Sequence, residues 1–492
     1  MSIRFKSFFK EELTINEIQT AMNNGEITSK ELVMYYLNRT AKYDQAGPRI
    51  NSMLEINPSA IFIAEGLDNE RETKGTRGPL HGIPVVLKDN IETNDFMHTS
   101  AGAIALENHL ADKDAFLVKK LRDAGTVILG KTNMTELANG MASGMWAGYS
   151  SRGGQTLNPY GDPKLFVGGS SSGSAVAVAA NFSVLSVGTE TDASILSPAV
   201  QNSVVGIKPT TGLISRSGMI PFTYSQDTAG PFARTVEDAA ILLGTLTGID
   251  KNDVATYKSE GKTQQDYTTY LDPAGLEDAR IGIFNDAHKE YYESDEYDEQ
   301  LFKNSIHVLA KQGATIMEGI EIPSFHRDWK KEVTSYELKH SLDNYLTKLP
   351  SHMPVHSISE LIHFNRSIEE KALKYGQDTL ERIEQLPNTL SNPEYLNAKI
   401  EDLYYSQEQG IDYALKKYNL DAIVFPSYIG STISARAGYP SIAVPAGYME
   451  SGRPFGITFA GTSFSEGELI KLAFAFEQAA NIRRSPKFNI EG

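Results

Sequence analysis

Residues 168–195 read GGSSSGSAVAVAANFSVLSVGTETDASI, and this stretch is the most informative part of the 492-residue chain. Glycines and serines fill positions 168–174, and a run of small residues from Ala175 to Ala180 follows them. This order predicts a turn that leads into a closely packed helix, because small side chains let neighbouring backbone approach. A second serine segment, GTETDASI, occupies residues 188–195.

The glycine-serine segment 168–174 has three interpretations on its own. It can be a flexible turn, since both residue types are common in loops. It can be an anion cradle ahead of a helix, although no Gly-Lys-Ser/Thr of a P-loop follows it. It also matches the G-x-S-x-G nucleophile elbow at residues 169–173. That elbow needs a strand just before it, and only residues 164–167 separate it from a Gly-Asp-Pro turn.

Strand-like and helix-like segments alternate along most of the chain. We expect strands and helices at Ile83–Leu87, Phe116–Leu121, Thr126–Leu129, Arg280–Phe284, Leu301–Lys311, Ala314–Ile322, Asp421–Phe425, Ser441–Val444, Phe455–Phe459 and Glu466–Ala480. Such alternation favours an α/β fold whose sheet is covered by helices on both faces.

The two flanks of this pattern are helical. Residues 14–43 predict two short helices, the second capped by Thr28 or Ser29. Residues 330–415 are polar and rich in Tyr, Glu and Lys, which predicts a helical excursion on the surface of the core. Length alone suggests roughly three domains. Because no repeat or Pro/Ser-rich linker divides the chain, we expect one large domain, 1–492, that includes this excursion.

Composition excludes several classes of partner and chemistry. The chain has 46 basic and 62 acidic residues, a net charge of −16, and no basic cluster, which argues against nucleic acid or an anionic membrane as partner. It has no cysteine, which excludes disulfides, thiolate metal sites and cysteine nucleophiles. Charged residues stand where a signal peptide needs an apolar core, and the apolar stretch Ser174–Val187 contains Asn181. We expect a cytoplasmic protein.

Further motifs accompany the two serine segments. Lys88 lies in HGIPVVLKDN, residues 81–90, and GKTN, GQT, GIKPT and SQDT follow at residues 130–133, 154–156, 206–210 and 225–228. In this order and spacing the chain resembles the amidase signature family, which hydrolyses carboxylic amides. The resemblance is dense from residue 78 to 234 and looser from 421 to 480. The wording SRGGQTLNPYGDP and GTETDxSI is most similar to the bacterial peptide amidases.

The resemblance implies a single α/β/α domain with a mixed central sheet, and a Ser–Ser–Lys triad. Ser194 matches the nucleophile that forms the acyl-enzyme. Ser170 matches the bridging serine, which follows a cis peptide bond, here Gly169–Ser170. Lys88 matches the base. The backbone N–H groups of Thr191, Asp192, Ala193 and Ser194 match the oxyanion hole, and no cofactor or metal is implied.

The physics of lysine supports this assignment. A serine hydroxyl needs an adjacent base, and lysine serves only when neutral, so its pKa must fall from ~10.4 towards ~7–8. Burial behind the apolar strand Ile83–Leu87 favours that fall for Lys88. Lys131 and Lys208 also follow apolar runs and are interpreted as structural ion-pair partners.

Three aspartates could suggest a metal site, but their spacing fits no ligand set. We interpret them as turn or hydrogen-bonding residues: Asp89, Asp192 and Asp227.

Two positions depart from the family pattern. Asp192-Ala193 stands where many members have Gly-Gly, and Leu196 stands where many have Arg. If the turn at residue 193 has φ > 0, alanine costs ~1–2 kcal/mol there; otherwise its methyl simply fills space beside the acyl pocket. The absence of Arg counts against the glutaminase subunit of a tRNA amidotransferase.

We therefore expect an amidohydrolase that converts a linear carboxamide, a peptide C-terminal amide or a small amide, to carboxylate and ammonia. No cofactor, partner subunit, nucleic acid or membrane is expected. Two alternatives stay open: a glutaminase subunit of an amidotransferase, and a non-catalytic binding protein on the same scaffold.

Overall fold

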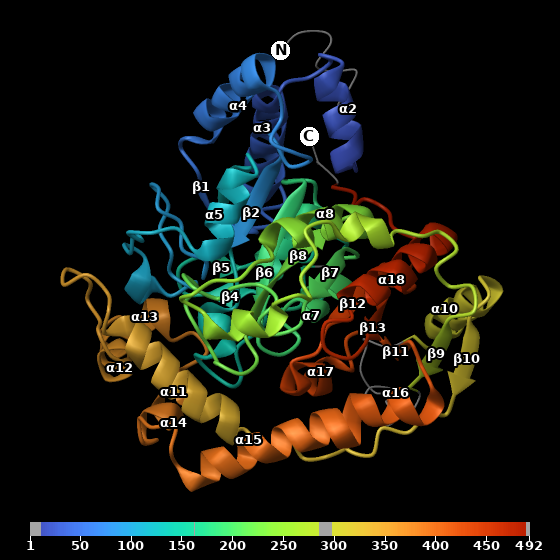
Figure 1. Ribbon diagram of the computed structural model, residues 1–492. Helices are drawn as coiled ribbons and strands as arrows, with labels where there is room; N and C mark the ends of the chain where they lie inside the picture. The colour runs from blue at the N-terminus through green and yellow to red at the C-terminus, as the bar shows by residue number, and fades with distance from the viewer. Residues whose placement is uncertain (1–10, 162, 285–297, 489–492) are drawn as a thin grey trace.

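A computed structural model describes residues 11–161, 163–284 and 298–488 (Figure 1). Its centre is an eleven-stranded sheet in the order β1-β3-β2-β6-β8-β7-β12-β13-β11-β9-β10. The strands of this sheet are β1 (Met53–Ile56), β2 (Pro84–Lys88), β3 (Val127–Thr132), β6 (Leu185–Glu190), β7 (Val205–Lys208), β8 (Thr228–Ala233), β9 (Arg280–Ile283), β10 (Thr315–Glu318), β11 (Ala422–Pro426), β12 (Ser441–Tyr448) and β13 (Pro454–Ala460). A small hairpin pairs β4 (Tyr149–Ser150) with β5 (Gly154–Gln155).

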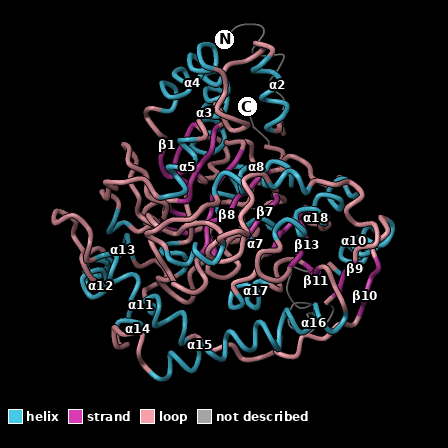
Figure 2. The backbone as a smooth tube through the Cα atoms, viewed as in Figure 1, coloured by secondary structure: helices cyan, strands magenta, loops and turns pink. Residues whose placement is uncertain are grey.

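Helices surround this sheet in the described part of the chain (Figure 2). They are α2 (Ile15–Asn23), α3 (Ser29–Arg39), α4 (Ala60–Lys74), α5 (Phe116–Asp123), α6 (Ser172–Ala179), α7 (Leu196–Gln201), α8 (Val236–Leu246), α10 (Glu299–Lys311), α11 (Glu332–Leu346), α12 (Ile358–Ser367), α13 (Glu369–Ala372), α14 (Asp378–Glu384), α15 (Pro393–Ser406), α16 (Asp412–Tyr418), α17 (Ser431–Ala437) and α18 (Glu466–Ala480).

The sheet is mixed and covered on both faces, so the expected fold class is confirmed. Strand β2 runs parallel to β3 and β6, whereas β8 runs antiparallel to β6 and β7. Helices α6 and α7 contact each other and the sheet on one side, while α5, α8 and α18 form a contiguous layer that packs on the sheet separately. Every residue of β2 is buried, as its continuous apolar sequence predicts for a strand covered on both faces.

Most sequence-based boundaries hold within a few residues. The cap of α3 is Thr28 rather than Ser29: its hydroxyl accepts the N–H of Glu31, whose side chain returns the contact. Strand β10 is shorter than the predicted Ala314–Ile322, because Gly319 follows it with φ +70° and turns the chain away. Helix α6 begins at Ser172, inside the glycine-serine segment.

The predicted excursion 330–415 is helical, but it is more than a surface cover. Leu338 and Leu342 of α11 are buried with Met134 and Leu137 in one apolar cluster. The segment therefore shapes one side of the molecule beside the central sheet (Figure 1). Whether the chain is one domain stays a prediction.

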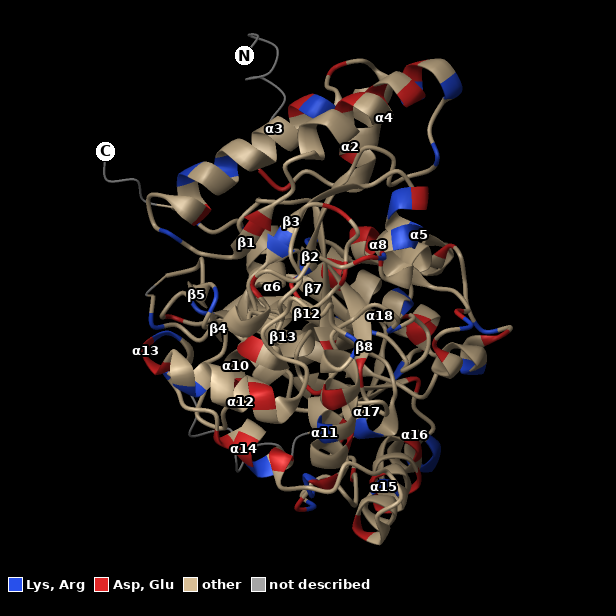
Figure 3. Ribbon diagram, turned by 90° about the vertical axis from the view of Figure 1, so that its left-hand side faces the viewer, with Lys and Arg blue, Asp and Glu red and all other residues tan. Residues whose placement is uncertain are grey.

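Charge is distributed over the outside of the molecule. Figure 3 shows Lys, Arg, Asp and Glu interspersed along outer helices such as α3 and α4. None of the helices in the described residues is long and apolar enough to cross a bilayer.

Candidate active site

Three lysines at the ends of central strands are fully buried: Lys88, Lys131 and Lys208. Loss of solvation lowers the pKa of Lys88 to about 7, although the carboxylates of Asp227 and Glu190 oppose the shift. The same cause lowers the pKa of Lys131 and of Lys208 to about 8. Burial alone therefore does not distinguish them, but their contacts do.

Lys88 is the buried lysine that lies against the serine segment. Its Nζ donates to the Oγ of Ser170 at 2.7 Å and to the Oγ of Ser171 at 2.9 Å. It also contacts Thr189, at 2.9 Å from the hydroxyl and 3.1 Å from the carbonyl oxygen. Since three of these four partners are hydroxyls, a neutral lysine here can exchange protons with a serine.

The other two buried lysines contact different groups. Lys131 Nζ donates to the Ile91 carbonyl at 2.6 Å and to the Thr99 hydroxyl at 2.7 Å. Lys208 Nζ donates to the carbonyl of Pro209 at 3.3 Å. Neither contacts a serine hydroxyl in these hydrogen bonds, which fits the structural role expected for them.

The glycine-serine segment is an ordered entry into α6. The Gly169–Ser170 peptide bond is cis, as the resemblance implied. The Ser170 carbonyl accepts the N–H of Thr135 at 3.1 Å, which ties the segment to the chain after β3. No strand precedes it at residues 163–170, so the interpretation as a nucleophile elbow is wrong.

The loop 191–194, here called the catalytic loop, joins β6 to the turn before α7. It ends at Ser194, which is 7% exposed and whose Oγ donates weakly to the Asp192 carbonyl at 3.4 Å. The structure shows no hydrogen bond between the Ser170 and Ser194 hydroxyls. Catalytic hydrogen bonds are often loose before substrate binds.

Two buried carboxylates fix the ends of the catalytic loop. Asp227 accepts the hydroxyl proton of Thr191 at 2.6 Å and two backbone N–H groups nearby. Glu190 accepts the N–H groups of Ile195 at 2.6 Å and Leu196 at 3.0 Å. Burial raises the pKa of Asp227, and it raises that of Glu190 to about 7 against the opposing charge of Lys208. The loop is thereby held in one conformation.

Ser170 and the catalytic loop line the same cavity, of about 550 Å³. Lys88 reaches this cavity wall through Ser170. Aromatic rings supply much of the remaining wall: Trp146, Phe166, Phe222, Trp329 and Tyr428. Trp146 and Phe166 meet edge to face, with ring centroids 5.6 Å apart. The cavity thus places two serines beside an apolar surface that can hold the acyl part of a substrate.

The catalytic loop also presents unused hydrogen-bond donors to the cavity. Within the described part of the chain, the backbone N–H groups of residues 191–194 make no hydrogen bond to another residue. Unpaired N–H groups that converge beside a nucleophile are what an oxyanion hole requires. The four predicted positions are therefore free to bind a developing negative charge.

Ala193 adopts φ +60°, in the left-handed region. The alternative of an ordinary φ at this position is therefore wrong. A side chain with a Cβ is disfavoured there by ~1–2 kcal/mol, and glycine is not. Its departure from glycine in the family pattern has a conformational cost in this chain.

We expect Ala193→Gly to raise kcat/KM on a reactive amide about tenfold, which corresponds to ~1.4 kcal/mol of relieved strain. The relief lets the loop N–H groups align on the oxyanion. Steady-state kinetics beside the parent enzyme measure this. An unchanged or lower kcat/KM would instead make the methyl group a contact with the substrate.

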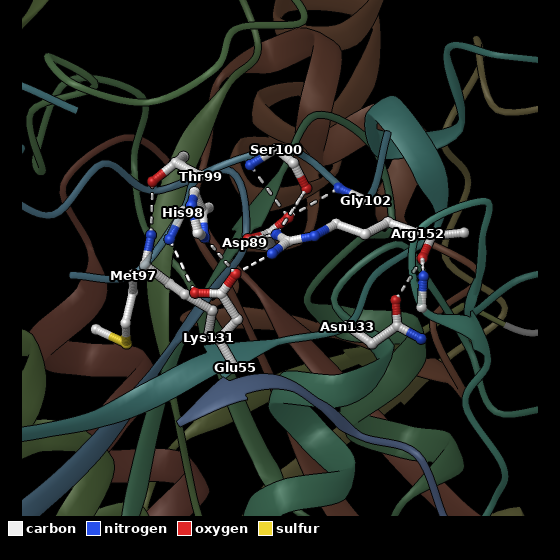
Figure 4. A network of polar contacts seen from close by, with 12 residues as sticks. Glu55, Asp89, Met97, His98, Thr99, Ser100, Gly102, Lys131, Asn133 and Arg152 are labelled. Carbon is white, nitrogen blue, oxygen red and sulfur yellow. Dashed lines mark hydrogen bonds and ion pairs between the residues drawn. The ribbon is translucent and has the colours of Figure 1, made fainter. Parts of the chain in front are cut away.

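Next to the lysine, Asp89 organises a buried polar network (Figure 4). Its carboxylate accepts the backbone N–H of Gly102 at 2.9 Å and the N–H and hydroxyl of Ser100. Arg152 lies 3.5 Å from it and also pairs with Glu55. The interpretation of Asp89 as a hydrogen-bonding turn residue is confirmed, and the network anchors the end of β2 that carries Lys88.

Sequence reasoning missed several parts of the site. Thr189 and Ser171 as partners of Lys88 are adjacent to predicted residues, so the motifs contained them without indicating their role. Glu190 lies in GTETDASI, and its buried position between two strands was not readable from spacing. Among the described residues, no three His, Asp or Glu side chains gather closely enough to hold a metal ion.

Comparisons with known proteins agree with this geometry. A family model described as Amidase matches residues 31–470. A probable amidase of Arabidopsis thaliana is 40% identical over 501 residues, covering 99% of this chain and 94% of its own. The X-ray structure of peptide amidase from Stenotrophomonas maltophilia is 40% identical with a TM-score of 0.91, covering 98% of this chain and 100% of that one. One component of the glutamyl-tRNA(Gln) amidotransferase of Pseudomonas syringae is 32% identical over 96% of this chain and 98% of its own.

These matches run over nearly the whole chain, and both the mixed sheet and the serine-lysine motifs are consistent with them. The alternative of a non-catalytic binding protein therefore loses its basis. The chain is an amidase, a hydrolase acting on C–N bonds, and belongs to the amidase signature family.

Proposed function

We propose that this amidase hydrolyses linear primary carboxamides, including the C-terminal amides of short peptides, to a carboxylate and ammonia. The observation that carries the proposal is the contact of Lys88 Nζ with Ser170 Oγ, in the wall of the cavity that also exposes Ser194. The 40% identity to a peptide amidase structure supports the peptide-amide substrate.

In the proposed reaction, neutral Lys88 takes the proton of Ser170 while Ser170 takes that of Ser194. The Ser194 oxygen attacks the amide carbon, and the N–H groups of the catalytic loop stabilise the oxyanion. As the C–N bond breaks, the proton returns through Ser170 to the leaving nitrogen, and ammonia departs. Water, deprotonated through the same two groups, then attacks the acyl-enzyme and releases the carboxylate with Ser194 restored.

A panel of amides assayed for ammonia release tests the substrate class. We expect higher kcat/KM for amides with an apolar or aromatic acyl part than for acetamide, because the cavity wall is largely aromatic. A short peptide amide and its free acid form a matched pair, of which only the amide releases ammonia. Ammonia from none of the panel would contradict the proposal.

The acidic limb of the pH profile should report Lys88. Since its pKa is lowered to about 7, the lysine is protonated and inactive as a base below that value. We expect kcat/KM to fall about tenfold per pH unit on the acidic side, and to be steady above the pKa until other groups titrate. A profile that rises only near pH ~10 would mean that the base has the pKa of an exposed lysine.

The identity to a component of an amidotransferase supports a second candidate, a glutaminase that works within a larger enzyme. Leu196 in place of the Arg common in that wording favours the stand-alone amidase. Ammonia release from glutamine that requires a copurifying partner protein would favour the glutaminase. Release from peptide amides by the purified chain alone would favour the amidase.

A further inference from the structure

A second cavity, of about 540 Å³, lies beside the catalytic loop and takes no part in the proposed reaction. It is bounded by residues 210–226, 255–262, α15, α17 and the turn before α18. Arg436 of α17 lines both this cavity and the substrate cavity, so the two adjoin at its side chain. We call it the rear cavity.

The rear cavity carries an excess of positive charge although the chain has a net charge of −16. Four cationic side chains and one carboxylate line it: Lys258, Lys262, Lys399, Arg436 and Asp402. Arg436 pairs with Asp402, and Lys399 pairs with a carboxylate behind the wall. Lys258 and Lys262 have no carboxylate partner in the described residues. Two uncompensated ammonium groups at one cavity favour an anionic occupant.

The position of one of these lysines is defined. Lys262 Nζ lies 4.3 Å from the centroid of the Phe464 ring, and Phe464 also lines the cavity. This cation–π contact holds the ammonium group at the cavity wall. The charge is therefore a feature of the cavity and not only of the solvent-exposed surface.

Three side chains in the wall have a buried polar atom without a partner among the described residues: Arg436 Nε, Thr211 Oγ1 and Gln226 Oε1. All three residues are at most 9% exposed. An arginine Nε can only donate, and a glutamine Oε1 can only accept. Buried polar groups are normally satisfied, so a suitable occupant supplies both an acceptor and a donor.

We propose that the rear cavity binds a small carboxylic acid that also carries an N–H or O–H group. The carboxylate lies towards Lys258, Lys262 and Arg436, and the donor serves Gln226. The same Gln226 donates from Nε2 to the carbonyl of Thr191 at 3.2 Å. Since Thr191 opens the catalytic loop, occupancy of the rear cavity alters turnover in the substrate cavity.

The test compares N-acetylglycine, which has a carboxylate and an N–H, with butyrate, which lacks the donor. Calorimetry is run on the parent enzyme, on Lys258→Gln/Lys262→Gln, and on Lys74→Gln/Lys251→Gln, which removes the same charge from exposed positions outside the cavity. We expect the parent and the control to bind N-acetylglycine equally. The first double variant should bind it about tenfold more weakly, the sum of two modest ion pairs, and butyrate should bind more weakly than N-acetylglycine throughout.

Kinetics on a neutral amide complete the test. N-acetylglycine should change kcat saturably in the parent and in the control, and much less in Lys258→Gln/Lys262→Gln, whose activity without the acid is unchanged. Equal binding by all three proteins, or no binding by the parent, would overturn the proposal. Purely competitive inhibition that persists in the double variant would place the acid in the substrate cavity and overturn it as well. Amide turnover without the acid is measured separately, so the proposed function is judged independently.

Discussion

Ser194→Ala should reduce kcat/KM for a primary amide by about 10⁴-fold or more, because the nucleophile that forms the acyl-enzyme is gone. Binding and the oxyanion donors remain, so a small residual rate is expected. The fold should persist, since the hydrogen bond that the Ser194 hydroxyl makes is a 3.4 Å contact with a nearby carbonyl. Ammonia release and a thermal melt measure the two properties.

Ser197 offers a matched control. It lines the same cavity three positions later and is similarly buried, but it belongs to α7 and lies beyond the catalytic loop. Ser197→Ala should keep its activity within about tenfold of the parent, an effect of ~1.4 kcal/mol or less. Activity in Ser194→Ala that approaches the parent's would show that another hydroxyl carries the acyl group.

Lys88→Arg should lose about 10³-fold or more in kcat, because arginine stays protonated and cannot act as a base. The substitution keeps the charge and donor character of the side chain while removing its ability to titrate near pH 7. Lys88→Met is a second variant for the case in which arginine does not fit the buried site. It is neutral and of similar length, so it should fold and be equally inactive.

The contacts of the three buried lysines define what would contradict this expectation. If Lys88→Arg and Lys88→Met both fold and keep substantial activity, the base is not Lys88. Lys131 would then be the next candidate, because its pKa is also lowered, to about 8. Its contacts with Ile91 and Thr99 would, however, have to rearrange before it could reach a serine.

Much of the fold could be predicted because local rules and tertiary structure agree in this chain. Helix α18 spans Glu466–Ala480 as its apolar spacing indicates, and β2 follows from an uninterrupted apolar run. The failure at β10 is local: the apolar pattern continues past Gly319, but the positive φ of that glycine ends the strand. Periodicity does not report such a turn.

The site residues were predictable only as motifs. Three lysines follow apolar runs, and sequence spacing cannot say which one meets Ser170, because that contact joins residues 82 positions apart. The positive φ of Ala193 was likewise a conditional expectation until the loop between β6 and α7 was seen. The cavity wall draws on residues from Thr135 to Arg436, so its aromatic character emerges only from the folded chain.

The excursion 330–415 shows the same limit. Its polar composition predicts a solvated surface segment, yet Leu338 and Leu342 are buried against the chain that follows β3. Composition averages over a helix and hides one apolar face. That face places Thr334 of the segment in the wall of the substrate cavity.

The central claim is that Ser194 is the residue acylated during turnover. The most direct measurement is labelling of the purified chain with a fluorophosphonate probe, followed by mass spectrometry of the peptides. The account predicts a single adduct on Ser194, and its disappearance in Ser194→Ala but not in Ser197→Ala. An adduct on Ser170 or Ser171 in the parent enzyme would contradict the account.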